Sequence, residues 1–134
     1  MNKSTRDNLS TAMRSEAFTY AKYMLFAERA RKTGNPELAQ LLEKTAKQEL
    51  LEHFAEEAAL AEIVRNDVDN LADAIASESY GIESMYRDFA EQAFSAGDKD
   101  VGDRFEEIRH DEMKHREAFK EALSKLGKNP LRAS

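Results

Sequence analysis

Apolar side chains recur every three or four residues through four long stretches of this chain. That spacing indicates amphipathic helices that bury one face each. On the first stretch, the side expected to be buried carries Leu9, Met13, Phe18, Tyr20, Tyr23 and Phe26. The pattern predicts an all-α protein whose four helices span about residues 5–32, 36–65, 70–95 and 100–126.

Helix-breaking residues separate these stretches. Gly34-Asn35-Pro36 divides the first helix from the second, and Pro36 suits the first turn of a helix. Gly97 and Gly127 follow the third and fourth helices. Four helices of this length, joined by short connections, predict a four-helix bundle.

Length and composition narrow the class of protein. A chain of 134 residues suits a single domain over residues 1–134. No apolar run approaches membrane-spanning length, so we expect no membrane association and a cytoplasmic location. The net charge of −6, with basic residues scattered along the helices, argues against a nucleic-acid partner.

The two halves of the sequence resemble copies of one helical hairpin. A shift of 63 residues maps Tyr23 onto Tyr86, Gly34 onto Gly97 and Glu49 onto Glu112. Glu16 breaks this register, because its counterpart, Glu78, lies 62 residues further on. The extra residue between Glu78 and Tyr86 predicts a local π-type bulge, a feature often found at functional sites.

Four carboxylates lie near the middle of the predicted helices, where apolar surface should be buried: Glu16, Glu49, Glu78 and Glu112. His115 follows Glu112 by three residues, so the two side chains share a helix face. Buried carboxylates are costly unless a partner neutralises them. Four that converge on one core predict a pair of metal ions bound between them.

The second helix leaves two candidate ligands open. The 63-residue shift places Glu52 opposite His115, while His53 lies one position further along. Either Glu52 is a carboxylate ligand, or a bulge turns His53 inward. Spacing alone does not decide, because Glu49 and His53 are also a same-face pair.

Simpler interpretations compete with the metal site. A single Glu-x-x-His motif on a helix is a weak signal, and a metal-free helical interaction module is an alternative function. His110 is expected at the surface, as are six further acidic residues: Glu43, Glu56, Glu57, Glu83, Glu106 and Glu107. The matched intervals of the four carboxylates favour the metal site.

Several short motifs resemble the rubrerythrin family of the ferritin-like superfamily. They are Ser15-Glu16 and Lys22-Tyr23 in the first helix, Thr45-Ala46 before Glu49 in the second, Glu78-Ser79-Tyr80 and Met85-Tyr86 in the third, and Glu112 with His115 in the fourth. The resemblance covers about residues 8–126.

The resemblance implies a ferritin-like four-helix bundle with a non-haem di-iron centre. The family implies reduction of hydrogen peroxide, and oxidation of ferrous iron by dioxygen is the alternative activity. Glu16, Glu49, Glu78, Glu112 and His115 would be ligands to two iron ions, one of which another divalent metal could replace. Tyr23 and Tyr86 would be catalytic residues that form hydrogen bonds near the irons.

Three departures from the family pattern stand out. The chain has no cysteine and therefore no rubredoxin-like iron site, so an external electron donor, rubredoxin-like or a reductase, is expected. The family's extra carboxylate in the third helix falls on Gly81. The histidine that exchanges with it during redox cycling falls on Glu52, so a centre closer to a ferroxidase is also conceivable.

The connection between the second and third helices is short. A ferritin-like bundle places these helices parallel, so the chain must return along the bundle. The four linker residues 66–69 reach only about 14 Å, against the roughly 30 Å required. The sequence therefore predicts a homodimer in which helices are swapped and each metal site is shared between chains.

Overall fold

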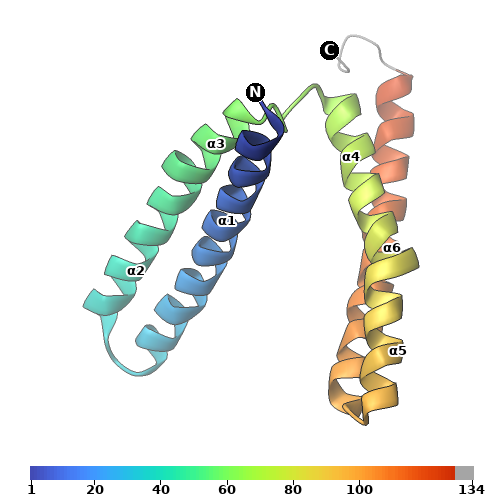
Figure 1. Cartoon of the computed structure of the whole chain (residues 1–134). Coiled ribbons are helices and arrows are strands. Elements are labelled where there is room, and N and C mark those ends of the chain that lie inside the picture. Colours follow the sequence, from blue (N-terminus) through green and yellow to red (C-terminus); the bar gives the residue numbers. More distant parts are fainter. Residues whose placement is uncertain (129–134) are drawn as a thin grey trace. The chain divides into compact units, whose positions relative to one another are not determined.

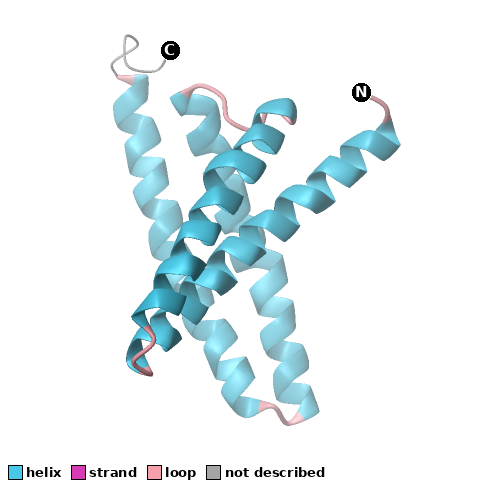
Figure 2. Cartoon of the chain, turned by 90° about the vertical axis from the view of Figure 1, so that its left-hand side faces the viewer, coloured by secondary structure: helices cyan, strands magenta, loops and turns pink. Residues whose placement is uncertain are grey.

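The computed structural model describes residues 1–128, and every regular element in that range is helical (Figures 1 and 2). The elements are α1 (Lys3–Lys32), α2 (Pro36–Gln48), the π-helix η1 (Glu49–Phe54), α3 (Ala55–Leu60), α4 (Asp67–Tyr80), the π-helix η2 (Gly81–Met85), α5 (Tyr86–Ala96) and α6 (Lys99–Gly127). The all-α prediction is confirmed. None of the helices within residues 1–128 combines the length and the hydropathy needed to cross a bilayer.

The chain forms two compact units, Met1–Val64 and the part from Arg65 onward. In the first, α1 packs against α2, η1 and α3, which follow one another without a break. In the second, α6 packs against α4, η2 and α5, which are likewise continuous. Each unit is thus a helical hairpin (Figure 1).

Polar caps and turn residues define the helix ends. The side chain of Asn2 accepts a 2.8 Å hydrogen bond from the backbone N–H of Thr5 at the start of α1, and that of Asn66 accepts one of 2.9 Å from Asp69 at the start of α4. Pro36 occupies the first turn of α2 as predicted. Gly97, at φ 86°, ends α5.

The continuous helical run of α2, η1 and α3 ends at Leu60, well before the predicted residue 65. Glu62 adopts a left-handed conformation with φ 54°. Its N–H bonds the carbonyl of Ala59 at 3.2 Å, and the N–H of Ile63 bonds that of Ala58 at 3.3 Å. This is the Schellman pattern, which usually has glycine at the left-handed position. The predicted end of the second helix was wrong because a glutamate at this position does not signal a helix end. The following helix, α4, also begins before the predicted residue 70.

Small residues let the helices of each hairpin approach closely. Ala27, Ala30 and Ala39 form the buried cluster of the first hairpin, and in the second hairpin a side chain on Gly102 would overlap the ring of Phe94. No large side chain is fully buried within residues 1–128. Large apolar residues instead remain exposed on the first hairpin, among them Phe18, Leu25, Phe26, Leu41, Leu51 and Leu60.

The exposure of Phe18 and Phe26, at 68% and 49%, corrects the expectation that both lie on the buried side of the first helix. Phe18 follows Glu16 by two residues, which at 3.6 residues per turn places it on the opposite face of α1. The inward face of α1 is therefore the one that carries Glu16, and Phe18 faces away from α2.

We predict that Glu62→Gly stabilises the protein by about 0.5–1 kcal/mol, because glycine adopts the left-handed conformation without the clash that a Cβ introduces. Urea unfolding at constant m-value measures the change. Glu56→Gly, within α3, is the matched control and should lower the free energy of unfolding by about 0.5–1 kcal/mol. A less stable Glu62→Gly protein would contradict the assignment of the turn.

Candidate metal centre

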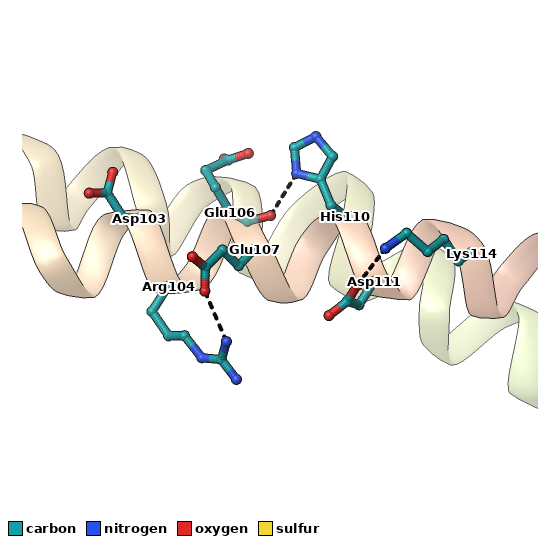
Figure 3. A pocket seen from close by; sticks show the side chains of 7 residues that line it. All are labelled: Asp103, Arg104, Glu106, Glu107, His110, Asp111 and Lys114. Carbon is teal, nitrogen blue, oxygen red and sulfur yellow. Dashed lines mark hydrogen bonds and ion pairs between the residues drawn. The ribbon is translucent and has the colours of Figure 1, made fainter.

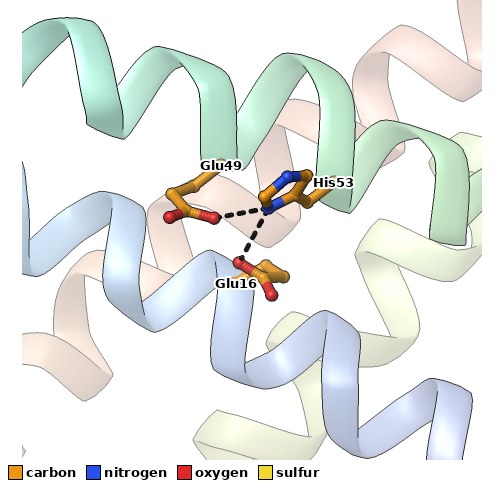
Figure 4. Close-up of side chains that lie close together, drawn as sticks. All are labelled: Glu16, Glu49 and His53. Atoms are coloured by element: carbon orange, nitrogen blue, oxygen red, sulfur yellow. Dashed lines mark hydrogen bonds and ion pairs between the residues drawn. The ribbon is translucent and has the colours of Figure 1, made fainter.

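The first hairpin brings together two carboxylates and one imidazole (Figure 4). Glu16 extends from α1, and Glu49 and His53 extend from η1. The Nδ1 atom of His53 lies 2.7 Å from Oε2 of Glu49 and 3.9 Å from Oε2 of Glu16. One potential ligand atom from each residue lies within 4.8 Å of the others. These three side chains therefore surround a volume suited to one cation.

The π-helical form of η1 explains why His53, and not Glu52, joins this cluster. A π-helix closes its hydrogen bonds over five residues and has a longer turn, so the fourth residue after Glu49 returns to the same face. The carboxylate of Glu52 instead accepts a 3.1 Å hydrogen bond from the side chain of Gln48. Of the two alternatives that the sequence left open, the structure brings His53 to Glu16 and Glu49.

The second hairpin contains a matching set. Glu78 comes from α4, and Glu112 and His115 come from α6. The Nδ1 atom of His115 lies 3.6 Å from Oε2 of Glu78. The Oε2 atoms of Glu78 and Glu112 are buried and lack a hydrogen-bond partner. An unpartnered buried carboxylate oxygen is costly, so both atoms call for a cation or a donor.

The bulge predicted between Glu78 and Tyr86 is present as η2, Gly81–Met85. Gly81 is buried, and a Cβ at this position would overlap the carboxylate of Glu112. The place where the family pattern has an extra carboxylate is thus occupied by the Glu112 side chain. Gly81 thus leaves room for the Glu112 carboxylate in its present position.

The electrostatics of both sets reflect crowded negative charge. The pKa of Glu16 is raised, first by the hydrogen bond its carboxyl shares with Glu49 and then by burial. That of Glu49 is lowered by the same contact and by His53, while Glu49 raises the pKa of His53. Burial, followed by the charge of Glu78, raises the pKa of Glu112. Each set therefore holds its negative charge against repulsion, which a bound cation would relieve.

The donor set fits iron and similar metals. Carboxylate and imidazole are the ligand types of non-haem iron sites in helical bundles. Each hairpin supplies two carboxylates and one imidazole, and buried oxygen atoms in the second set have no other partner. The residues present are therefore compatible with a metal centre held by carboxylates and imidazoles.

The two tyrosines remain half-buried. The ring of Tyr23 lies 6.3 Å from that of Phe26, and the ring of Tyr86 lies 5.9 Å from that of Phe105. Among the hydrogen bonds found within residues 1–128, none involves either hydroxyl group. The catalytic role suggested by the family resemblance stays a prediction.

Three of the six acidic residues expected in solvent are half-buried: Glu43, Glu57 and Glu106. Glu57 is the one that lies near a carboxylate set. Glu57 is half-buried, its Oε2 atom is buried without a hydrogen-bond partner, and its charge contributes to the raised pKa of Glu16. Its position four residues after His53 is the sequence signal that places it on the same face. Glu83, in contrast, is exposed as expected and pairs with Arg116 at 2.9 Å.

His110 faces away from the carboxylate sets. Its Nδ1 atom lies 2.8 Å from the backbone oxygen of Glu106 on the outer face of α6. Figure 3 shows it in a polar surface depression with Asp103, Arg104, Glu106, Glu107, Asp111 and Lys114. Pairs such as Arg104 with Glu107 satisfy these charges within the helix. This face has the features of a solvated helix surface.

We predict that Gly81→Ala weakens metal binding about tenfold or more, because the new methyl group displaces the carboxylate of Glu112. Stability should change by less than about 1 kcal/mol, since a flexible side chain can move aside. Anaerobic Fe²⁺ titration and urea unfolding measure the two effects. Gly127→Ala is the control, because a Cβ there meets nothing within 4 Å. Equal iron affinity in both variants would show that Glu112 is no ligand.

Comparisons with known proteins identify the family of this chain. The sequence model of the family described as Rubrerythrin matches residues 7–62 and 49–123. Nigerythrin from Nitratidesulfovibrio vulgaris (strain Hildenborough) is 29% identical over 137 residues, which cover 92% of this chain and 67% of that protein. The family matches span both hairpins and include all six residues of the two sets. The chain therefore belongs to the rubrerythrin family.

Proposed function

We propose that this protein is a non-haem di-iron oxidoreductase that reduces hydrogen peroxide with electrons from an external donor. The observation that carries the proposal is the pair of matched sets, Glu16, Glu49 and His53 on one hairpin and Glu78, Glu112 and His115 on the other. Together they offer four carboxylates and two imidazoles, the donor set of di-iron bundles. Family membership supports the assignment.

The roles of the protein groups follow from their chemistry. Two ferrous ions would supply the two electrons that, with two protons, convert one hydrogen peroxide molecule into two water molecules. The four carboxylates would bind these ions and balance their charge. His53 and His115 would each give one ion a neutral nitrogen ligand, so the two positions would be similarly equipped.

We propose that the electrons come from a separate donor. The sequence contains no cysteine and thus no thiolate-bound iron to serve as an internal relay. A rubredoxin-like protein or a reductase is the donor we propose. A cytoplasmic location is proposed with it.

We further propose that the site is completed in a domain-swapped homodimer. In a ferritin-like bundle the second and third helices run parallel. Leu60 then lies about 10 Å beyond His53, and Asp67 about 16 Å before Glu78, at 1.5 Å per residue. The chain would have to return roughly 27 Å, and the seven steps from Leu60 to Asp67 span at most roughly 25 Å when fully extended.

The linker is also not extended. Glu62 is left-handed, and the Asn70 side chain bonds both the N–H and the carbonyl of Arg65 at 2.8 Å. These turns shorten the reach of residues 61–66 further. The large apolar side chains left exposed on the first hairpin supply a surface that a second chain could cover.

One observation favours a second candidate activity, the oxidation of ferrous iron by dioxygen. The family's extra carboxylate is absent, since Gly81 stands in its place and Glu112 fills the space. His53, however, lies beside Glu16 and Glu49, and we propose that it replaces the histidine that the family pattern has at position 52. The position of Gly81 then remains as a departure from the family pattern, and the missing carboxylate there supports ferroxidase activity.

We predict that the purified protein takes up two Fe²⁺ per site under anaerobic conditions, and that Glu112→Ala abolishes this uptake because one of the proposed carboxylate ligands is lost. Elemental analysis and stopped-flow absorbance measure binding and oxidation. Glu107→Ala, a 65% exposed residue of the same helix, is the control.

Rapid oxidation of the diferrous protein by peroxide and slow oxidation by dioxygen would support peroxide reduction. The opposite order would favour the ferroxidase. A folded protein that takes up no iron would refute both and leave the helical interaction module.

We predict that the protein sediments as a dimer at micromolar concentration. Inserting about twelve Gly/Ser residues between Val64 and Arg65 should give metal-binding monomers, because the lengthened linker can return along one bundle. Analytical ultracentrifugation measures the mass. An equal insertion between Gly34 and Asn35, within the first hairpin, is the control and should leave the dimer intact. A monomeric unmodified protein with bound iron would refute the swap.

A further inference from the structure

The π-helix η2 leaves one buried carbonyl group without its usual backbone donor. In a regular α-helix the N–H of Tyr86 would bond the carbonyl four residues back, that of Ile82. In η2 this N–H bonds the carbonyl of Gly81 instead. Ile82 is only 3% exposed, so water has little access to the released oxygen atom. A buried carbonyl of this kind needs another donor.

Arg109 of α6 supplies that donor. Its Nε atom donates a 2.7 Å hydrogen bond to the carbonyl oxygen of Ile82. The guanidinium is partly buried, with 25% of the side chain exposed, and its NH1 group lies 3.4 Å from the carboxylate of Glu106. Arg109 is thus oriented by one residue of its own helix and bonded to the irregular turn of the neighbouring one.

The position of this contact relates it to the second carboxylate set. Arg109 lies three residues before Glu112 on α6, and Ile82 follows Gly81, whose backbone borders the Glu112 carboxylate. Arg116, four residues after Glu112, bonds Ser79 at 3.3 Å and Glu83 at 2.9 Å. Two arginines of α6, one on either side of Glu112, therefore bind the segment that contains the bulge.

The bulge determines which side chains point inward. One inserted residue rotates the helix that follows it by about 100° relative to the helix before it. Tyr86 and Phe89 pack on Phe105 beyond the bulge, each ring 5.9 Å away. Glu78 lies before the bulge and faces His115. The two arrangements coexist because the π-helical turn η2 lies between them.

We propose that Arg109 is a positioning residue whose bond to Ile82 holds η2 in its π-helical form, and that it thereby keeps Glu78 and Glu112 in place for metal binding. The metal-binding part of this inference rests on the proposed function. The 63-residue repeat places Ala46 opposite Arg109, and Ala46 is fully buried in the first hairpin. The first hairpin therefore has no arginine at the position that corresponds to Arg109.

The first experiment follows the metal-free full-length protein by amide hydrogen exchange. Arg109→Met removes the donor and keeps the aliphatic stem, and Arg104→Met is the matched control, a 67% exposed arginine of the same helix. Exchange at residues 81–86 should be at least about tenfold faster in Arg109→Met and unchanged in Arg104→Met. Equal exchange in the two variants would overturn the proposal.

The second experiment uses Co²⁺ as a spectroscopic probe of the ligands. Arg109→Met should bind Co²⁺ about 10- to 100-fold more weakly and show altered visible d–d bands, while Arg104→Met matches the unmodified protein. Arg109→Lys, which retains a donor, should recover part of the affinity and the original bands. It also replaces Arg109→Met should that variant fail to fold.

The outcomes separate the two proposals. If Arg109→Met folds and has the affinity and bands of the unmodified protein, the positioning role is refuted. If the unmodified protein binds no Co²⁺ or Fe²⁺, the proposed di-iron function fails, and the exchange experiment still decides whether Arg109 holds η2.

Discussion

The repulsion among inward-facing carboxylates is the constraint on which this structure depends. The contact with Glu49 raises the pKa of Glu16, and burial followed by the charge of Glu78 raises the pKa of Glu112. A fold optimised for stability alone would place apolar residues at these positions. The cost is tolerated because the same groups, arranged around a divalent cation, become ligands. The packed helices of each hairpin bring these groups close together.

Two π-helices adjust the register where regular helices would fail. In η1 the longer turn brings His53 rather than Glu52 beside Glu49. In η2 the extra residue lets Glu78 face α6 while the aromatic residues after the bulge also pack against it. Such irregular turns are less favourable than α-helix and persist where the surroundings compensate for them. Here the compensation includes a hydrogen bond from Arg109 to the released carbonyl of Ile82.

The sequence allowed most of the helices and the central carboxylates to be predicted, because apolar periodicity and helix breakers are local signals. The bulge at Gly81–Met85 was predicted from a broken repeat. The choice between Glu52 and His53 could not be made, since it depends on a π-helical turn that leaves no mark in residue spacing. The early end of α3 was missed because Glu62 takes a conformation that glycine normally signals. Glu57 was assigned to solvent because the register beyond η1 was unknown.

The two π-helices lie in different places within the repeat. In the first hairpin η1 lies in the second helical stretch, and in the second hairpin η2 lies in the first helical stretch. The halves therefore cannot be exchanged, although their ligands match in kind. A polypeptide built from two copies of residues 1–64 would have a π-helix in each histidine-containing helix. It would have no counterpart of Gly81. Any ancestral twofold symmetry has thus been lost in the backbone itself, so the two ligand sets match in residue type but differ in the helix geometry that holds them.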